Sequence, residues 1–126
     1  MSIRISTLSN GLRVATDPQR TVESVALGLW FDVGTRHEKP HENGVAHLLE
    51  HMVFKGTTRR RAFDISAEME SVGGMMNAYT GRETTAYYAR VLKGDVPLAV
   101  DMIGDIVQNS LFEAEELERE REVVMQ

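Results

Sequence analysis

Apolar and polar positions near the start of the chain follow the patterns of β-strands. Apolar-rich segments at residues 3–8 and 12–15 flank Ser9-Asn10-Gly11, and an Asn-Gly pair between two such segments is a strong signal for a β-hairpin. Residues 22–33 form a longer run with apolar side chains at both odd and even positions. This run predicts a strand covered on both faces, and therefore a central place in a sheet.

The apolar spacing becomes helical after residue 43. Asn43 and Gly44 are expected to start a helix that carries apolar residues on successive turns, and Gly56 is expected to stop it after Lys55. A second helix is predicted over residues 62–72, ending at a Gly-Gly pair.

Two strands and two more helices are predicted in the second half of the chain. Residues 75–80 and 84–92 are rich in Tyr, Thr and Val and are separated by a short glycine-containing turn, as in paired strands. A third helix is expected to begin at Asp95 and a fourth, rich in Glu and Arg, to cover residues 112–126. The third helix repeats apolar residues on one face: Val96, Val100, Ile103 and Val107. Strands followed by helices, without an internal repeat or linker, predict one α+β domain.

Composition removes several classes of function. The chain has 126 residues, 42% hydrophobic and 26% charged, which is ordinary for a single soluble domain. A net charge of -5 argues against a nucleic-acid partner, which normally meets a basic face. Residues 59–61 are three consecutive arginines, and a solvated turn is a more common setting for such a run than a phosphate-binding site.

The absence of cysteine limits the available chemistry. With no Cys in the chain, disulfides, thiolate zinc sites and cysteine nucleophiles are excluded, so any metal must bind to N and O ligands. No apolar stretch is long enough for a membrane span, and Met1 does not begin a typical leader. These features predict no membrane partner and a cytoplasmic protein, or a mature chain whose leader has been removed.

Residues 47–51 read HLLEH, and this motif carries the strongest chemical signal. On a helix with about 100° per residue, His51 lies about 40° and Glu50 about 300° from His47, so the three share one face. Two imidazoles on successive turns can bind one zinc ion, and a carboxylate beside them can deprotonate a water that attacks a carbonyl. The order H-x-x-E-H performs the same chemistry as H-E-x-x-H. The alternative is a polar helix face that points into solvent.

A catalytic zinc site needs a third protein ligand in addition to the two histidines. His37 and His41 lie in the loop before the predicted helix, where histidines are usually solvated. The other candidates are the glutamates of the last helix, most of which are expected to form a solvated face with Arg119 and Arg121.

Several ordered blocks resemble one family of enzymes. The blocks are TLSNGLRV at 7–14, FDVGTRHE at 31–38, NGVAHLLEHMVFKGT at 43–57, GGMMNAYTGRETTAYYARV at 73–91 and ELERERE at 116–122. Together they resemble the N-terminal part of the M16 zinc metallopeptidases, the pitrilysin-like and processing-peptidase-like family. The resemblance covers essentially the whole chain. It implies a mixed, mainly antiparallel sheet with helices packed on one face.

The resemblance also implies roles for individual residues. His47 and His51 would be zinc ligands and Glu50 the general base. Residues 75–80 would be an edge strand to which an extended peptide substrate adds as a further strand. Asn77, Ala78 and Tyr79 would then lie on the substrate side; without the family, this segment reads as an ordinary strand.

The third zinc ligand of the family is a glutamate about 75 residues after the second histidine, which here would be the residue immediately after Gln126. Glu120, two helical turns earlier, resembles the family's auxiliary acidic residue, which supports the site without being the usual ligand. Residues 1–126 are therefore expected to be the N-terminal part of a longer peptidase domain, whose parent pairs two homologous halves or subunits. Such a piece is expected to bind zinc weakly, to be inactive by itself and to self-associate through uncovered apolar surface.

Two functions fit these observations. The first is a zinc-dependent endopeptidase, or part of one, which hydrolyses peptide bonds with water that the metal activates. The second is a noncatalytic module of the same fold that binds peptides or partner subunits. Noncatalytic relatives generally lose the H-x-x-E-H residues, so the intact His47, Glu50 and His51 favour the first.

Overall fold

The computed structural model describes residues 2–125 and begins with the predicted hairpin. Strands β1 (Arg4–Thr7) and β2 (Arg13–Thr16) pair in antiparallel register. The turn between them is closed by a hydrogen bond of 2.8 Å from Leu8 N to Leu12 O, and Gly11 has φ +90°. A positive φ strongly favours glycine, so the Asn-Gly signal is confirmed.

A second, three-stranded antiparallel sheet holds the rest of the strands. Its order is β3 (Ser24–Phe31), β5 (Thr85–Leu92) and β4 (Met75–Thr80). The prediction that residues 22–33 form a central strand is wrong: β5 is central and β3 lies at an edge among the described residues. The apolar run of β3 was misleading because Trp30 and Phe31 are exposed rather than covered, at 60% and 39%.

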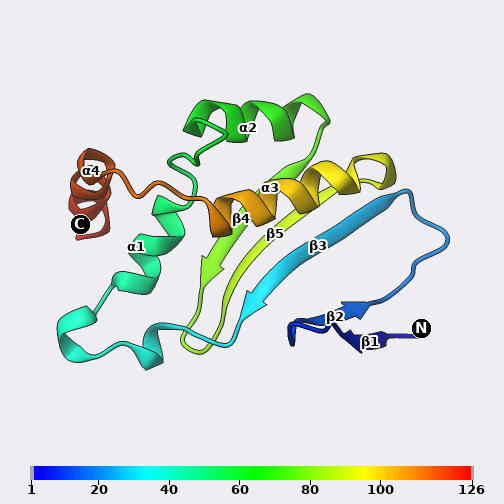
Figure 1. Cartoon of the computed structure of the whole chain (residues 1–126), viewed down its shortest axis with the longest axis horizontal. Helices are drawn as coiled ribbons and strands as arrows, with labels where there is room; N and C mark the ends of the chain where they lie inside the picture. Colours follow the sequence, from blue (N-terminus) through cyan, green and yellow to red (C-terminus); the bar gives the residue numbers. More distant parts are fainter. Residues whose placement is uncertain (1, 126) are drawn as a thin grey trace.

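The helices nearest this sheet lie on one face of it, and the last helix packs against the first (Figure 1). Apart from short 3-10 turns, they are α1 (Val45–Met52), α2 (Ala62–Ser71), α3 (Val96–Gln108) and α4 (Ala114–Val124). Alternate residues of β5, Tyr87, Ala89 and Val91, point into a core that α3 fills with Met102 and Ile106. The α+β fold with an antiparallel sheet and helices on one face is therefore confirmed. No helix within residues 2–125 is long and apolar enough to cross a membrane.

Several helix boundaries differ from the predictions. Helix α1 ends at Met52, because hydrogen bonds from Phe54 N to His51 O and from Lys55 N to Met52 O tighten its last turn. Gly56, with φ +136°, lies in the following loop instead of stopping the helix. Helix α4 begins two residues later than predicted, at Ala114, and the expectation for Gln126 lies outside the described residues.

The buried face of α3 is also rotated relative to the prediction. Val100, assigned to the apolar face, is 56% exposed. The residues that α3 buries are Ala99, Met102, Ile103, Asp105 and Ile106. The i, i+3, i+4 pattern of α3 fits more than one face, and the position of the sheet decides between them.

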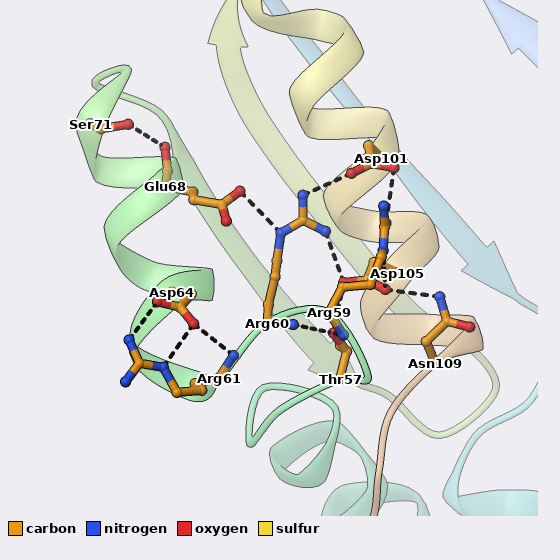
Figure 2. A network of polar contacts seen from close by, with 10 residues as sticks. All are labelled: Thr57, Arg59, Arg60, Arg61, Asp64, Glu68, Ser71, Asp101, Asp105 and Asn109. Carbon is orange, nitrogen blue, oxygen red and sulfur yellow. Dashed lines mark hydrogen bonds and ion pairs between the residues drawn. The ribbon is translucent and has the colours of Figure 1, made fainter.

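The prediction of a solvated arginine turn is wrong for Arg60, whose side chain is largely buried. Figure 2 shows the guanidinium of Arg60 between Glu68 of α2 and the two aspartates of α3, with bonds of 3.0 Å to Glu68, 2.7 Å to Asp101 and 2.8 Å to Asp105. Arg59 contacts the same two aspartates. Arg59 and Arg61 are both largely exposed, and Arg61 is paired with Asp64 one turn later. The loop after α1 is thereby fastened to α2 and α3.

Asp105 is the centre of this network. Burial by itself raises the pKa of its carboxyl, but hydrogen bonds from Asn109, Arg60 and Thr57 more than offset that effect and hold the pKa well below its usual value. The carboxylate is therefore charged, buried and fully paired.

Candidate metal centre

The first turn of α1 is capped by a side chain from the preceding loop, that of Glu38. Gly44 occupies the N-cap position with φ +92° and has no side chain to offer. Glu38 replaces it: one carboxylate oxygen accepts the N–H of Gly44 at 2.8 Å and the other accepts the N–H of Ala46 at 2.8 Å. These bonds pair backbone N–H groups that have no partner within the helix, and they place negative charge where the helix dipole favours it. Glu38 therefore anchors the helix that carries the HLLEH motif.

The Nε2 atoms of His47 and His51 face each other. Their Nε2 atoms are 3.1 Å apart, and the rings lie edge to face with centroids 4.7 Å apart. Two nitrogens that bind one tetrahedral zinc ion at about 2.0–2.1 Å stand roughly 3.3 Å from each other. The pair therefore fits two positions of a zinc coordination shell, in the arrangement that the helical spacing predicts.

The other nitrogen of His51 is held by Glu120 of α4, which lies beside α1 (Figure 1). The distance from His51 Nδ1 to Glu120 Oε2 is 2.7 Å, and Lys55 Nζ lies 2.7 Å from Glu120 Oε1. The ion pair with Lys55 is the main cause of the lowered pKa of Glu120; burial opposes it and the bond from His51 adds to it. Glu120 therefore lies behind His51, as an outer carboxylate.

Glu50 is joined to the end of strand β4. Thr80 Oγ1 donates to Glu50 Oε2 at 2.5 Å. The same hydroxyl lies 3.4 Å from the carbonyl oxygen of Ala46, so it links two successive turns of α1 to the sheet. Burial raises the pKa of the Tyr87 hydroxyl, and the negative charge of Glu50 raises it further. Glu50 is thus held between α1 and the sheet.

Among residues 2–125, strand β4 lies at an edge of its sheet, as the resemblance implies. Gly81 N–H donates to Thr84 O beyond the strand end. Because bonded and non-bonded pairs alternate in an antiparallel ladder, Asn77 and Tyr79 bond to β5, and the intervening residues point their backbone groups outward. Ala78 N–H accordingly finds a partner in the side-chain oxygen of Asn77 at 2.8 Å. The side chain of Ala78 is buried in the core, so Ala78 offers only its backbone.

The other third-ligand candidates are not at this site. His37 accepts the N–H of Gly34 through Nδ1, and His41 lies 3.5 Å from Glu42. In α4, Arg119 pairs with Glu115 and Glu116, as expected for a solvated face. Within residues 2–125, no group of three His, Asp or Glu side chains can hold a metal ion. The two imidazoles therefore fit zinc, while the described residues do not complete its coordination.

Three supporting residues were not recognised in the sequence: Glu38, Lys55 and Thr80. Lys55 lies four residues after His51 but beyond the end of α1, and its partner Glu120 is distant in the sequence. Glu38 and Thr80 act across loops and strands, and no local pattern indicates their partners.

The comparisons with known proteins show the family of this chain. The sequence profile of the insulinase family, peptidase family M16, matches residues 13–126. A probable mitochondrial-processing peptidase subunit beta of Arabidopsis thaliana is 49% identical over 122 residues, 97% of this chain and 23% of that protein. A zinc protease of Streptomyces coelicolor is 46% identical over 125 residues, 99% of this chain and 27% of that protein.

The fold has a similar counterpart among solved structures. The crystal structure of a protease from Helicobacter pylori matches with a TM-score of 0.91 and 26% identity, over 97% of this chain and 30% of the other. The chain thus spans about a quarter of the length of the curated relatives it matches. A match across nine-tenths of the chain, with relatives at 46–52% identity, shows that the chain belongs to the insulinase family of peptidases, M16.

Proposed function

We propose that this chain carries the zinc-binding helix of a zinc-dependent endopeptidase. The observation that supports the proposal most directly is the separation of 3.1 Å between the Nε2 atoms of His47 and His51, one residue away from a carboxylate on the same helix. When bound, zinc supplies Lewis acidity that polarises a peptide carbonyl and acidifies water.

In this proposal Glu50 is the general base. Its carboxylate takes a proton from the attacking water and returns it to the leaving amine, so that one residue serves both halves of the hydrolysis. Thr80, which donates to Glu50 Oε2, orients the carboxylate and leaves Oε1 available for the water. Anchoring the base to both α1 and β4 limits its motion, which favours proton transfer over a short distance.

Glu120 would determine which nitrogen of His51 is available. A carboxylate that accepts the Nδ1–H of an imidazole fixes the tautomer and leaves the lone pair on Nε2. This matches the orientation observed, with Nδ1 toward Glu120 and Nε2 toward His47. A third protein ligand is assigned to a residue outside 1–126, since the described residues do not supply one.

The substrate proposed is an extended peptide that pairs with the open edge of β4. The outward backbone groups of Met76 and Ala78 provide the hydrogen bonds, as in other cases of strand addition. Asn77 would release the N–H of Ala78, which it accepts in the peptide-free chain. Because Thr80 lies on the same strand and contacts Glu50, a peptide bound along β4 would run toward the general base.

The test uses a protein extended past Gln126 in the parent sequence. Glu50→Gln is expected to keep its zinc content and lose peptide cleavage by several orders of magnitude, because the amide cannot accept the proton. A matched control is Glu83→Gln, which removes an exposed carboxylate paired with Arg36 and is expected to leave cleavage unchanged. Retained cleavage in Glu50→Gln would remove Glu50 from the base role.

The second candidate is a noncatalytic module that binds peptides or a homologous subunit. It is supported by relatives named as a subunit of a peptidase. The same experiment separates the two functions. A binding module captures peptide equally in the wild type and in Glu50→Gln, and the wild type does not cleave it.

A further inference from the structure

Lys55 makes one contact whose geometry suggests more than neutralisation of charge. It follows α1 by three residues, and the tightened turn that ends the helix directs it toward α4. Its Nζ lies 2.7 Å from Glu120 Oε1, while Glu120 Oε2 lies 2.7 Å from His51 Nδ1. The two oxygens of one carboxylate are therefore divided between the lysine and the histidine.

The orientation of the Glu120 carboxylate depends on Lys55 because the site is largely shielded from water. The side chain of Glu120 is only 10% exposed and that of Lys55 is 34% exposed, so water competes weakly for the carboxylate. Among the described residues, Lys55 is the only partner of Oε1. Without it, the carboxylate is free to rotate about its last bond and to move away from His51.

The consequence reaches the ring nitrogen that faces His47. When Glu120 Oε2 accepts from Nδ1, the hydrogen of the neutral ring resides on Nδ1 and Nε2 presents a lone pair. If the carboxylate turns away, the tautomer with hydrogen on Nε2 becomes populated, and this tautomer cannot bind a metal through Nε2. The effect of Lys55 therefore passes through Glu120 to His51.

We propose that Lys55 is a positioning residue that fixes the orientation of the Glu120 carboxylate and, through it, keeps Nε2 of His51 free for metal binding. This inference rests on the proposed zinc site. Its first test, however, is made on the metal-free chain and does not depend on zinc or on cleavage.

The test measures the ring ¹⁵N shifts of His51 in the metal-free chain, at a pH where the ring is neutral. The wild type is expected to show the Nδ1–H tautomer as the dominant species. Lys55→Met is expected to give a mixture of tautomers, and Lys55→Arg to restore the wild-type spectrum because arginine keeps the charge and the donors. Zinc titrations of the same proteins are expected to show an affinity about 10-fold to 100-fold lower for Lys55→Met, the range found for outer-shell partners.

Lys93→Met is the matched control, because Lys93 also pairs with a glutamate, Glu23, but at an exposed position. It is expected to leave both readouts unchanged. Far-UV circular dichroism establishes that each variant is folded. If Lys55→Met is not folded, Lys55→Gln is used in its place, with the same expected loss of the tautomer preference.

A double-mutant cycle tests the route through Glu120. In a Glu120→Gln background, Lys55→Met is expected to have no further effect on the tautomer of His51. The proposal is overturned if Lys55→Met resembles Lys93→Met in tautomer and zinc affinity, or if it acts equally in both backgrounds. Failure of the zinc site itself appears differently, as absence of zinc binding in the wild type while the tautomer still responds to Lys55.

Discussion

Removing the carboxylate of Asp105 tests how the loop after α1 is held. This side chain is fully buried on α3 and accepts hydrogen bonds from Thr57, Arg59, Arg60 and Asn109. Asp105→Ala deletes all four bonds and leaves the largely buried guanidinium of Arg60 without one of its partners. The substitution also opens a cavity the size of the lost carboxylate.

The expected cost follows from breaking one side of a buried ion pair, which is typically about 3–5 kcal/mol. The other carboxylates around Arg60, Asp101 and Glu68, remain, so a value near the lower end is expected. Even about 3 kcal/mol is a large part of the roughly 5–15 kcal/mol that stabilises an ordinary domain. The fold should survive, but with a clearly lower free energy of unfolding.

The assay is equilibrium unfolding in urea, followed by circular dichroism, with the free energy of unfolding extrapolated to water. Glu23→Ala serves as the control, since it breaks the exposed pair with Lys93 and is expected to change stability little. The double variant Arg60→Met with Asp105→Leu should lose less than the sum of the two single changes, because neither buried charge is left alone. If Asp105→Ala lowered the free energy of unfolding as little as Glu23→Ala, the network around Asp105 would not contribute to stability.

Three further predictions concern pH, backbone packing and the α1 cap. The pKa of Asp105 is lower in the folded chain than in the unfolded chain, so its stabilising effect is present above the unfolded value of about 4 and is lost as pH falls below it. The free energy of unfolding, measured in urea at a series of acid pH values, should therefore fall less steeply with pH in Asp105→Asn than in the wild type. Gly34→Ala should destabilise the chain, because a Cβ there would lie 2.4 Å from the carbonyl oxygen of Gly81. Gly104→Ala, whose Cβ would have nothing within 4 Å, should instead stabilise α3 by up to about 1 kcal/mol in urea unfolding. Equal effects of the two substitutions would contradict the close approach of Gly34 to Gly81. Glu38→Ala should lower the free energy of unfolding by about 1–2 kcal/mol, as for loss of an N-cap, and should weaken zinc binding as measured by titration. An unchanged free energy of unfolding would show that Glu38 is not needed to cap α1.

The parts of the structure that the sequence predicts are those with local causes. The hairpin at Asn10-Gly11, the helix end at Gly73 and the shared face of His47 and His51 each depend on backbone preferences within a few residues. The helical spacing places the two imidazoles on one face, while the side-chain rotamers and the contact of His51 with Glu120 set the distance between their Nε2 atoms. The shared face is therefore available before any tertiary structure is known, and the ring orientations are not.

The parts that the sequence does not predict depend on contacts between distant residues. The edge position of β3 depends on which strands lie beside it, and its apolar side chains are the same at an edge or in the centre. Arg59 and Arg60 could be read only as charged loop residues, since Asp101 and Asp105 lie more than 40 positions away. Lys55, Thr80 and Glu38 belong to the same class, because each supports α1 through a tertiary contact.

The account depends most directly on His47 and His51 sharing one metal ion through their Nε2 atoms. Zinc titration of the 126-residue chain, followed by ring ¹⁵N shifts of its four histidines, tests that claim. We expect Nε2 of His47 and of His51 to shift together as zinc is added, Nδ1 of His51 to keep its hydrogen, and His47→Ala to abolish the response of His51. A response centred on His37 or His41, or binding by His51 that persists without His47, would contradict the account.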